Sequence, residues 1–163
     1  MNILSFDTGL NVGWSIINIH NKTLLEWGIK HFDLSEGIGQ YCDDLWDYFS
    51  NFYYDIDIIR IEMPEFYGDK KGIISAKRGD LFVVHASAIT IYNFFRECFV
   101  ELIKPKEWKG QMDKKATENR VKIIMGDQIN NILKLPKYKK EHILDSIGIG
   151  LSYDKELWSL RKE

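Results

Sequence analysis

The 163-residue sequence predicts one α/β domain over residues 1–163, with a mixed five-stranded sheet flanked by helices. Two observations support this fold class. Three short apolar runs follow one another near the N-terminus, a pattern typical of an antiparallel meander, and two later runs alternate with segments of helical periodicity. Hydrophobic residues make up 45% of the chain and charged residues 28%, which favours a globular protein with its own core.

Strands are expected in the apolar and β-branched runs at residues 2–6, 12–19, 23–30, 56–61 and 99–103. Helices are expected where apolar residues recur at intervals of three and four, at residues 37–54, 75–98, 114–125 and 139–153, and over parts of 127–133. The segment 75–98 is apolar on more than one face. One face of this helix can therefore pack on the core while another meets a partner subunit.

Charge is distributed unevenly along the chain, although the net charge is only -2. Residues 33–62 contain eight acidic residues and one basic residue, a local charge of -7, whereas residues 104–140 contain eleven basic and four acidic residues, a local charge of +7. The second segment could form a basic face for a phosphate backbone. Alternatively, its lysines simply solvate helices.

Cys42 and Cys98 have neither a metal-binding spacing nor the density of a disulfide framework, which favours a reducing, intracellular setting. The first residues lack the basic segment of a signal peptide, and the longest apolar stretch, 81–95, is shorter than the ~20 residues that a membrane span needs. We therefore expect a cytoplasmic protein with no membrane partner.

Four polar residues fall where the predicted fold brings side chains together. Asp7 ends the first strand, Glu62 ends the fourth, and His142 and Asp145 lie one turn apart on the last helix. Carboxylates with one imidazole suit two divalent ions such as Mg²⁺ or Mn²⁺, and such ions can promote phosphodiester cleavage. Taken singly, each residue has a simpler interpretation: Asp7 as a turn former, Glu62 as a solvated strand end, and His142 as an ordinary helix residue. Asp145 interrupts an apolar stretch, where an unpaired carboxylate is costly.

Three motifs together resemble the RuvC-type Holliday-junction resolvases, which have a ribonuclease H-like fold. Residues 3–14 read ILSFDTGLNVGW and resemble the first motif, an apolar strand that delivers an Asp before a small residue and Gly-Leu. Residues 59–62, IRIE, resemble the second, and residues 142–150, HILDSIGIG, resemble the last. The motifs occur in order, and the resemblance spans residues 1–153. The small size and the Lys- and Asn-rich composition resemble the bacteriophage branch of the family.

The resemblance implies a metal-dependent endonuclease that binds two ions and cleaves branched DNA, chiefly Holliday junctions. Asp7, Glu62, His142 and Asp145 would form the metal-binding and catalytic set. Many relatives have Asp at the position of His142, so this residue could bind metal or protonate the leaving group, and Glu141 could compensate for the missing carboxylate.

The resemblance also implies how the DNA is held. Lys109 and Lys115 would assist at the scissile phosphate, and the implied DNA-binding set is Phe66, Tyr67, Lys70, Lys71, Lys77, Arg78, Lys109, Lys114 and Lys115. Aromatic residues after the catalytic Glu contact bases in relatives, although Phe66 could instead be a loop anchor. Relatives are homodimers, and the helix over 75–98 would form the two-fold interface.

Other functions are compatible with parts of the pattern. Sugar kinases and actin-like ATPases share the opening strand and Asp-x-Gly, but they need a second phosphate-binding loop and a much longer chain. A degenerate site would leave a branched-DNA binding module, and phage relatives often cleave flaps and forks as well as junctions. The joint presence of Asp7, Glu62 and Asp145 favours the nuclease.

Overall fold

The five strands form a single mixed sheet in a computed structural model that describes residues 1–50, 52, 55–65 and 79–159. The strand order is β3-β2-β1-β4-β5, with antiparallel pairing of β1 with β2 and β2 with β3, and parallel pairing of β1 with β4 and β4 with β5. The strands are β1 (Asn2–Asp7), β2 (Asn11–Asn18), β3 (Thr23–His31), β4 (Ile58–Glu62) and β5 (Val100–Ile103). The predicted fold class is confirmed.

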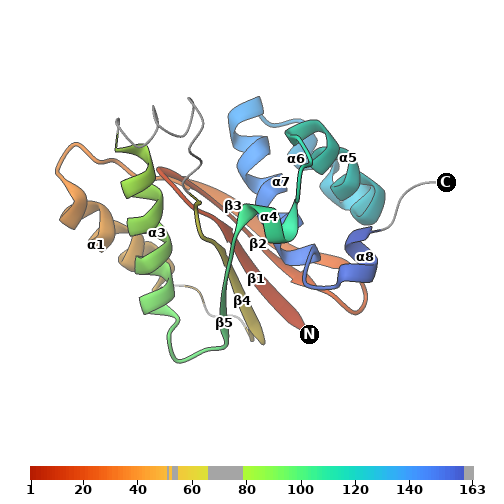
Figure 1. The fold of residues 1–163 in the computed structure, drawn as a ribbon, viewed down its shortest axis with the longest axis horizontal. Helices are drawn as coiled ribbons and strands as arrows, with labels where there is room; N and C mark the ends of the chain where they lie inside the picture. Colours follow the sequence, from red (N-terminus) through yellow and green to blue (C-terminus); the bar gives the residue numbers. More distant parts are fainter. Residues whose placement is uncertain (51, 53–54, 66–78, 160–163) are drawn as a thin grey trace.

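Helices cover both faces of this sheet, α1 and α3 on one side and α5 to α8 on the other (Figure 1). The helices of the described residues are α1 (Ile38–Phe49), α3 (Asp80–Phe94), α4 (Pro105–Trp108), α5 (Lys114–Met125), η1 (Gly126–Ile129), α6 (Asn130–Leu133), α7 (Lys137–Leu151) and α8 (Lys155–Ser159). Because both faces are covered, β1 is buried at every position from Ile3 to Asp7. Its alternate side chains enter two separate cores, Ile3 on the α7 side and Leu4 on the α1 side.

Several element boundaries differ from the predictions. Helix α1 ends at Phe49, and α3 ends at Phe94, short of the predicted 98, while residues 75–78 lie outside the described residues. Helix α7 begins at Lys137, directly after Pro136, two residues before the predicted start. The short helices α4 and α8 were not predicted, because four or five residues are too few for an apolar period to show. No described helix is long and apolar enough to span a membrane.

Gly13 lies at a close approach of α7 to the sheet. It pairs with Asp7 across the β1–β2 ladder, and a Cβ atom at this position would lie 2.3 Å from the backbone oxygen of His142. The absence of a side chain at Gly13 therefore lets α7 pack directly against β2, the strand that pairs with β1 at Asp7.

Replacement of Gly13 by alanine should force α7 away from β2, since the clashing atoms are backbone and cannot rotate away. We expect Gly13→Ala to destabilise the protein by about 1–3 kcal/mol in urea unfolding. Gly39→Ala is the matched control, because Gly39 lies in α1 with no atom within 4 Å of the new Cβ and should gain about 0.5–1 kcal/mol. Equal stabilities for the two variants would contradict the close approach.

Candidate active site

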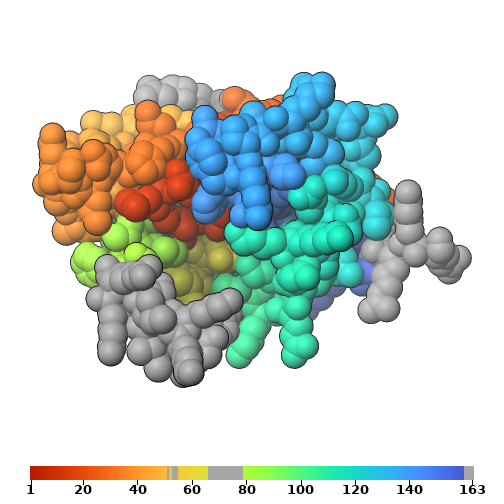
Figure 2. Space-filling view, turned by 90° about the horizontal axis from the view of Figure 1, so that it is seen from above, coloured from red at the N-terminus to blue at the C-terminus, as the bar shows by residue number. Residues whose placement is uncertain are grey.

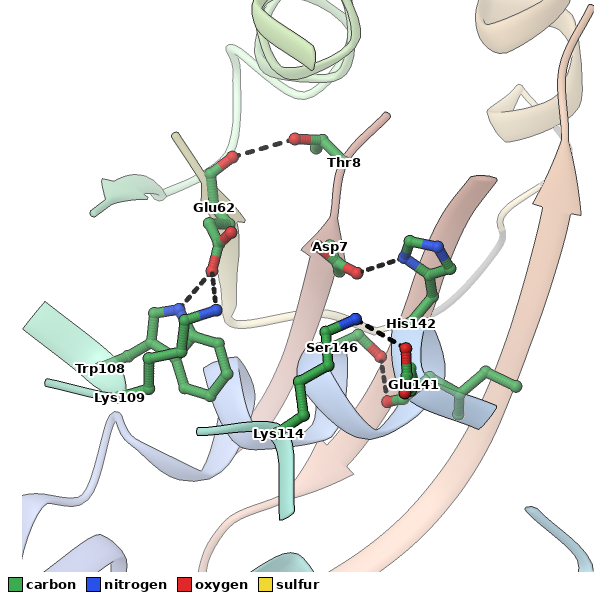
Figure 3. Close-up of polar contacts among 10 residues, drawn as sticks. Asp7, Thr8, Glu62, Trp108, Lys109, Lys114, Glu141, His142 and Ser146 are labelled. Carbon is green, nitrogen blue, oxygen red and sulfur yellow. Dashed lines mark hydrogen bonds and ion pairs between the residues drawn. The ribbon is translucent and has the colours of Figure 1, made fainter. Parts of the chain in front are cut away.

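Asp7 and Glu62 lie together because their strands are parallel neighbours. Strands β1 and β4 pair in register with Phe6 opposite Ile61, so the next residue of each strand lies at the same edge of the sheet. Helix α7 buries Ile143 and Ile147 in the core beside β1 and brings His142 to this edge (Figure 3). Residues from three segments that are distant in the sequence, β1, β4 and α7, therefore lie at one edge of the sheet.

His142 and Asp7 are directly hydrogen-bonded. The Nδ1 atom of His142 lies 2.6 Å from Oδ2 of Asp7, and the two side chains point toward each other (Figure 3). This hydrogen bond raises the pKa of His142 above its ordinary value, against the effect of burial. The contact therefore favours an imidazolium paired with the Asp7 carboxylate.

Glu62 is held by two residues of the segment after β5. Its Oε2 atom accepts a hydrogen bond from Nε1 of Trp108 at 2.5 Å, and Nζ of Lys109 lies 3.9 Å from the same oxygen. Burial, followed by the nearby charge of Asp7, nevertheless raises the pKa of Glu62 to about 7. Trp108 and Lys109 therefore do not offset the effect of burial and of the Asp7 charge on the Glu62 carboxylate.

Asp145 experiences the same electrostatic environment. Burial raises its pKa to about 6, and the charge of Asp7 contributes to the rise. Lys109 and Lys114 are near enough to lower the pKa of Asp145 in opposition to this trend. Three acidic side chains therefore share a buried region with a deficit of positive charge.

This donor set fits a hard divalent cation, which prefers carboxylate oxygens and would supply the missing charge. Within residues 1–50, 52, 55–65 and 79–159, however, no three His, Cys, Asp or Glu side chains are already gathered at a metal-holding distance. The hydrogen bonds explain this spread, since His142 engages Asp7 while Trp108 and Lys109 draw Glu62 the other way. Metal binding would require these side chains to rotate.

The predicted basic residues Lys109, Lys114 and Lys115 form a lysine wall, and the first two are paired with acidic side chains. Nζ of Lys114 lies 2.6 Å from Glu141, Lys137 lies 3.8 Å from the same carboxylate, and the hydrogen bond from Lys114 lowers the pKa of Glu141. Glu141 is therefore paired with lysines instead of completing the acidic set. Lys115 is exposed and lines a hollow of about 230 Å³ together with Lys114 and Asp145.

The other predicted DNA contacts cannot be placed against this site. Phe66, Tyr67, Lys70, Lys71, Lys77 and Arg78 all lie outside the described residues. Their roles remain predictions from the sequence.

Residues that sequence reasoning did not assign also shape the site. Trp108 holds Glu62, the hydroxyl of Thr8 donates to the backbone oxygen of Glu62 at 3.1 Å, and the buried hydroxyl of Tyr41 donates to the backbone oxygen of Gly9 at 2.7 Å. A usable signal existed for Trp108: Pro105 is a good first residue of a helix, and such a helix places Trp108 directly after β5. Nothing in the periodicity of α1 distinguishes Tyr41 from the other core residues.

No protein-family model matches this chain, and no curated protein sequence matches it significantly. Solved structures do. The chain is similar to T. thermophilus RuvC in complex with a Holliday junction substrate, with a TM-score of 0.58, 17% identity and coverage of 93% of this chain and 92% of that one. The fowlpox virus Holliday junction resolvase has a TM-score of 0.53 and 19% identity over 96% of this chain and 99% of that one.

The yeast mitochondrial Holliday junction resolvase Ydc2 is also similar, with a TM-score of 0.62 and 14% identity over 96% of this chain and 79% of that one. The TM-scores of 0.53 to 0.62 show a shared fold, and the high coverage shows that this fold extends over nearly the whole chain. Together with the mixed five-stranded sheet, these similarities show that the chain has the ribonuclease H-like fold of the RuvC-type Holliday-junction resolvases.

Proposed function

We propose that this protein is a metal-dependent endonuclease that cleaves phosphodiester bonds in branched DNA, chiefly four-way junctions. The observation that carries the proposal is the convergence of Asp7, Glu62 and Asp145, whose burial and mutual repulsion raise the pKa values of the last two to about 7 and about 6. Buried carboxylates with too little positive charge are a costly arrangement that a bound cation would relieve.

Asp7, Glu62 and Asp145 would hold two Mg²⁺ or Mn²⁺ ions. When bound there, the ions would supply the positive charge that favours attack by water and departure of the 3′ oxygen. The raised pKa of His142 favours its protonated form, which suits it to donate a proton to the leaving oxygen. Ligation by His142 is the alternative and would require the neutral ring.

Lys109, Lys114 and Lys115 would bind the phosphates on either side of the scissile bond. Two of them already form ion pairs at the site, Lys109 with Glu62 and Lys114 with Glu141. Each of these lysines can therefore exchange its carboxylate partner for an incoming phosphate. Lys115, for which no described carboxylate lies within ion-pair distance, adds positive charge to the same wall.

A second copy of the chain would pack against α3. Phe82 on this helix is 62% exposed, Ile89 48% and Tyr92 39%, which leaves a large apolar surface for a monomer. A two-fold dimer through this surface would present two active sites, and a four-way junction requires two symmetric nicks.

The test is cleavage of end-labelled four-way junction, flap, fork and linear duplex DNA in Mg²⁺, Mn²⁺ or EDTA. We expect paired, symmetric nicks in the junction with either metal and no product in EDTA. Cutting of several branched forms would instead identify a broader debranching nuclease. Binding without metal-dependent cutting of any substrate would contradict the enzyme and leave a branched-DNA binding module.

A further inference from the structure

A groove separate from the predicted lysine wall lies on the other side of the amino-terminal turns of α7. Its lining consists of Asn11, Ile29, His31, Tyr138 and Lys139, and its volume is about 490 Å³. Ligand pockets typically measure about 300–1,000 Å³, so the groove has room for one nucleotide unit. Strand β3, which contributes Ile29 and His31 to the lining, is one of the two edge strands of the sheet.

The groove is continuous with the candidate active site. Tyr138, His142 and Asp145 are spaced by four and three residues on α7, so they share one face of the helix. Asn11 lines this groove and also the adjoining hollow that contains Thr8 and His142. In Figure 2 the blue surface of the α7 region lies directly beside the red surface of the amino-terminal residues.

The chemistry of the lining is that of a nucleotide site. Tyr138 is 56% exposed, and Nζ of Lys139 lies 5.9 Å from the centre of its ring. Nδ1 of His31 lies 3.0 Å from the side-chain oxygen of Asn11. None of the five lining residues is acidic. An aromatic face beside a positive charge is the combination with which proteins hold an unpaired base and its phosphate.

Lys139 also differs from its neighbours in its ion pairs. Lys137 lies within ion-pair distance of Glu141, and Lys140 within that distance of Glu118. In the part of the chain that the structure describes, no carboxylate lies within ion-pair distance of Lys139. Its charge is therefore available to a phosphate without loss of an ion pair.

We propose that this groove binds an unpaired nucleotide of the DNA strand that enters the active site, with its base stacked on Tyr138 and its phosphate beside Lys139. The inference rests on the proposed function and narrows the substrate class to branched DNA with an accessible single-stranded nucleotide next to the branch. An unpaired nucleotide is required because the faces of bases within a duplex are already stacked on their neighbours.

The experiment compares equilibrium binding of two labelled forks in EDTA, one with a single-stranded arm and one with the same arm made duplex. Tyr138→Ala should weaken binding of the single-stranded fork about tenfold, whereas Tyr138→Phe, which keeps the ring, should stay within about twofold of the wild type. Neither variant should change binding of the duplex fork. Phe99→Ala is the matched control, because Phe99 is 63% exposed and precedes β5 at the opposite edge of the sheet.

The salt dependence of DNA binding distinguishes the phosphate contact of Lys139 from the base contact of Tyr138. Lys139→Ala should reduce the slope of log Kd against log salt concentration by about one, while Tyr138→Ala should leave the slope unchanged. If Tyr138→Ala and Lys139→Ala both bind the single-stranded fork as the wild type does, this inference is overturned and the proposed function stands. No binding of either fork by the wild type would overturn both.

Discussion

Asp7→Asn should lower the rate of junction cleavage on the order of 10³-fold or more and leave junction affinity unchanged. The charge of Asp7 acts on both other acidic groups, because it contributes to the raised pKa of Glu62 and of Asp145. The amide has nearly the same size and can still accept the hydrogen bond from His142, so the fold should persist. What is lost is the negative charge that a cation requires.

Single-turnover cleavage and EDTA binding assays on the same preparation would separate these two effects. Asp43→Asn is the control, since Asp43 is an exposed aspartate on α1, away from the acidic edge. Cleavage by Asp7→Asn at the wild-type rate would remove Asp7 from the site. Equal loss of cleavage and binding would indicate a role in holding DNA.

The convergence of Asp7 and Glu62 could be predicted from sequence because it depends on only two facts: each residue ends an apolar strand, and the two strands are parallel neighbours. Helical spacing predicts that His142 and Asp145 share one face of their helix. Both inferences depend on local sequence patterns, the end of an apolar strand and the spacing along a helix, which can be recognised without knowledge of distant contacts.

The partners of the acidic groups could not be predicted in the same way. Trp108 reaches Glu62 over a separation of 46 residues, and the choice of oxygen depends on rotamers that no periodicity encodes. From the sequence, the basic segment at 104–140 could form a basic face or simply solvate helices, whereas in the folded chain Lys114, Lys122, Lys137 and Lys140 are paired with Glu118 or Glu141. Counting charges along a sequence does not reveal which of them fold onto each other.

Asp145→Asn should stabilise the metal-free protein at pH 7 while abolishing cleavage. The pKa of Asp145 is raised from 3.8 to about 6, mainly by burial, so its ionisation at neutral pH opposes folding. Removal of this charge should add roughly 1–3 kcal/mol to the free energy of unfolding. Asp43→Asn, which changes an exposed residue, should stay within about 0.5 kcal/mol of the wild type.

The pH dependence of this difference has a defined sign. A carboxyl group with a raised pKa in the folded state favours folding fully only below its ordinary value, here 3.8, and that contribution is lost as the pH rises through about 6. The stability advantage of Asp145→Asn should therefore be small at pH 4 and complete above about pH 6. An advantage that is the same at pH 4 and pH 7 would show that it does not come from the charge.

The thermal unfolding temperature of the wild type and Asp145→Asn at pH 7, with and without Mn²⁺, tests the metal centre most directly. A cation that binds only the folded protein stabilises it, and it would bind the wild-type carboxylates far better than the asparagine variant. We predict that Asp145→Asn melts higher without metal and that Mn²⁺ raises the melting temperature of the wild type alone, reversing the order. Equal shifts in both proteins, or none in either, would contradict a metal centre built on Asp7, Glu62 and Asp145.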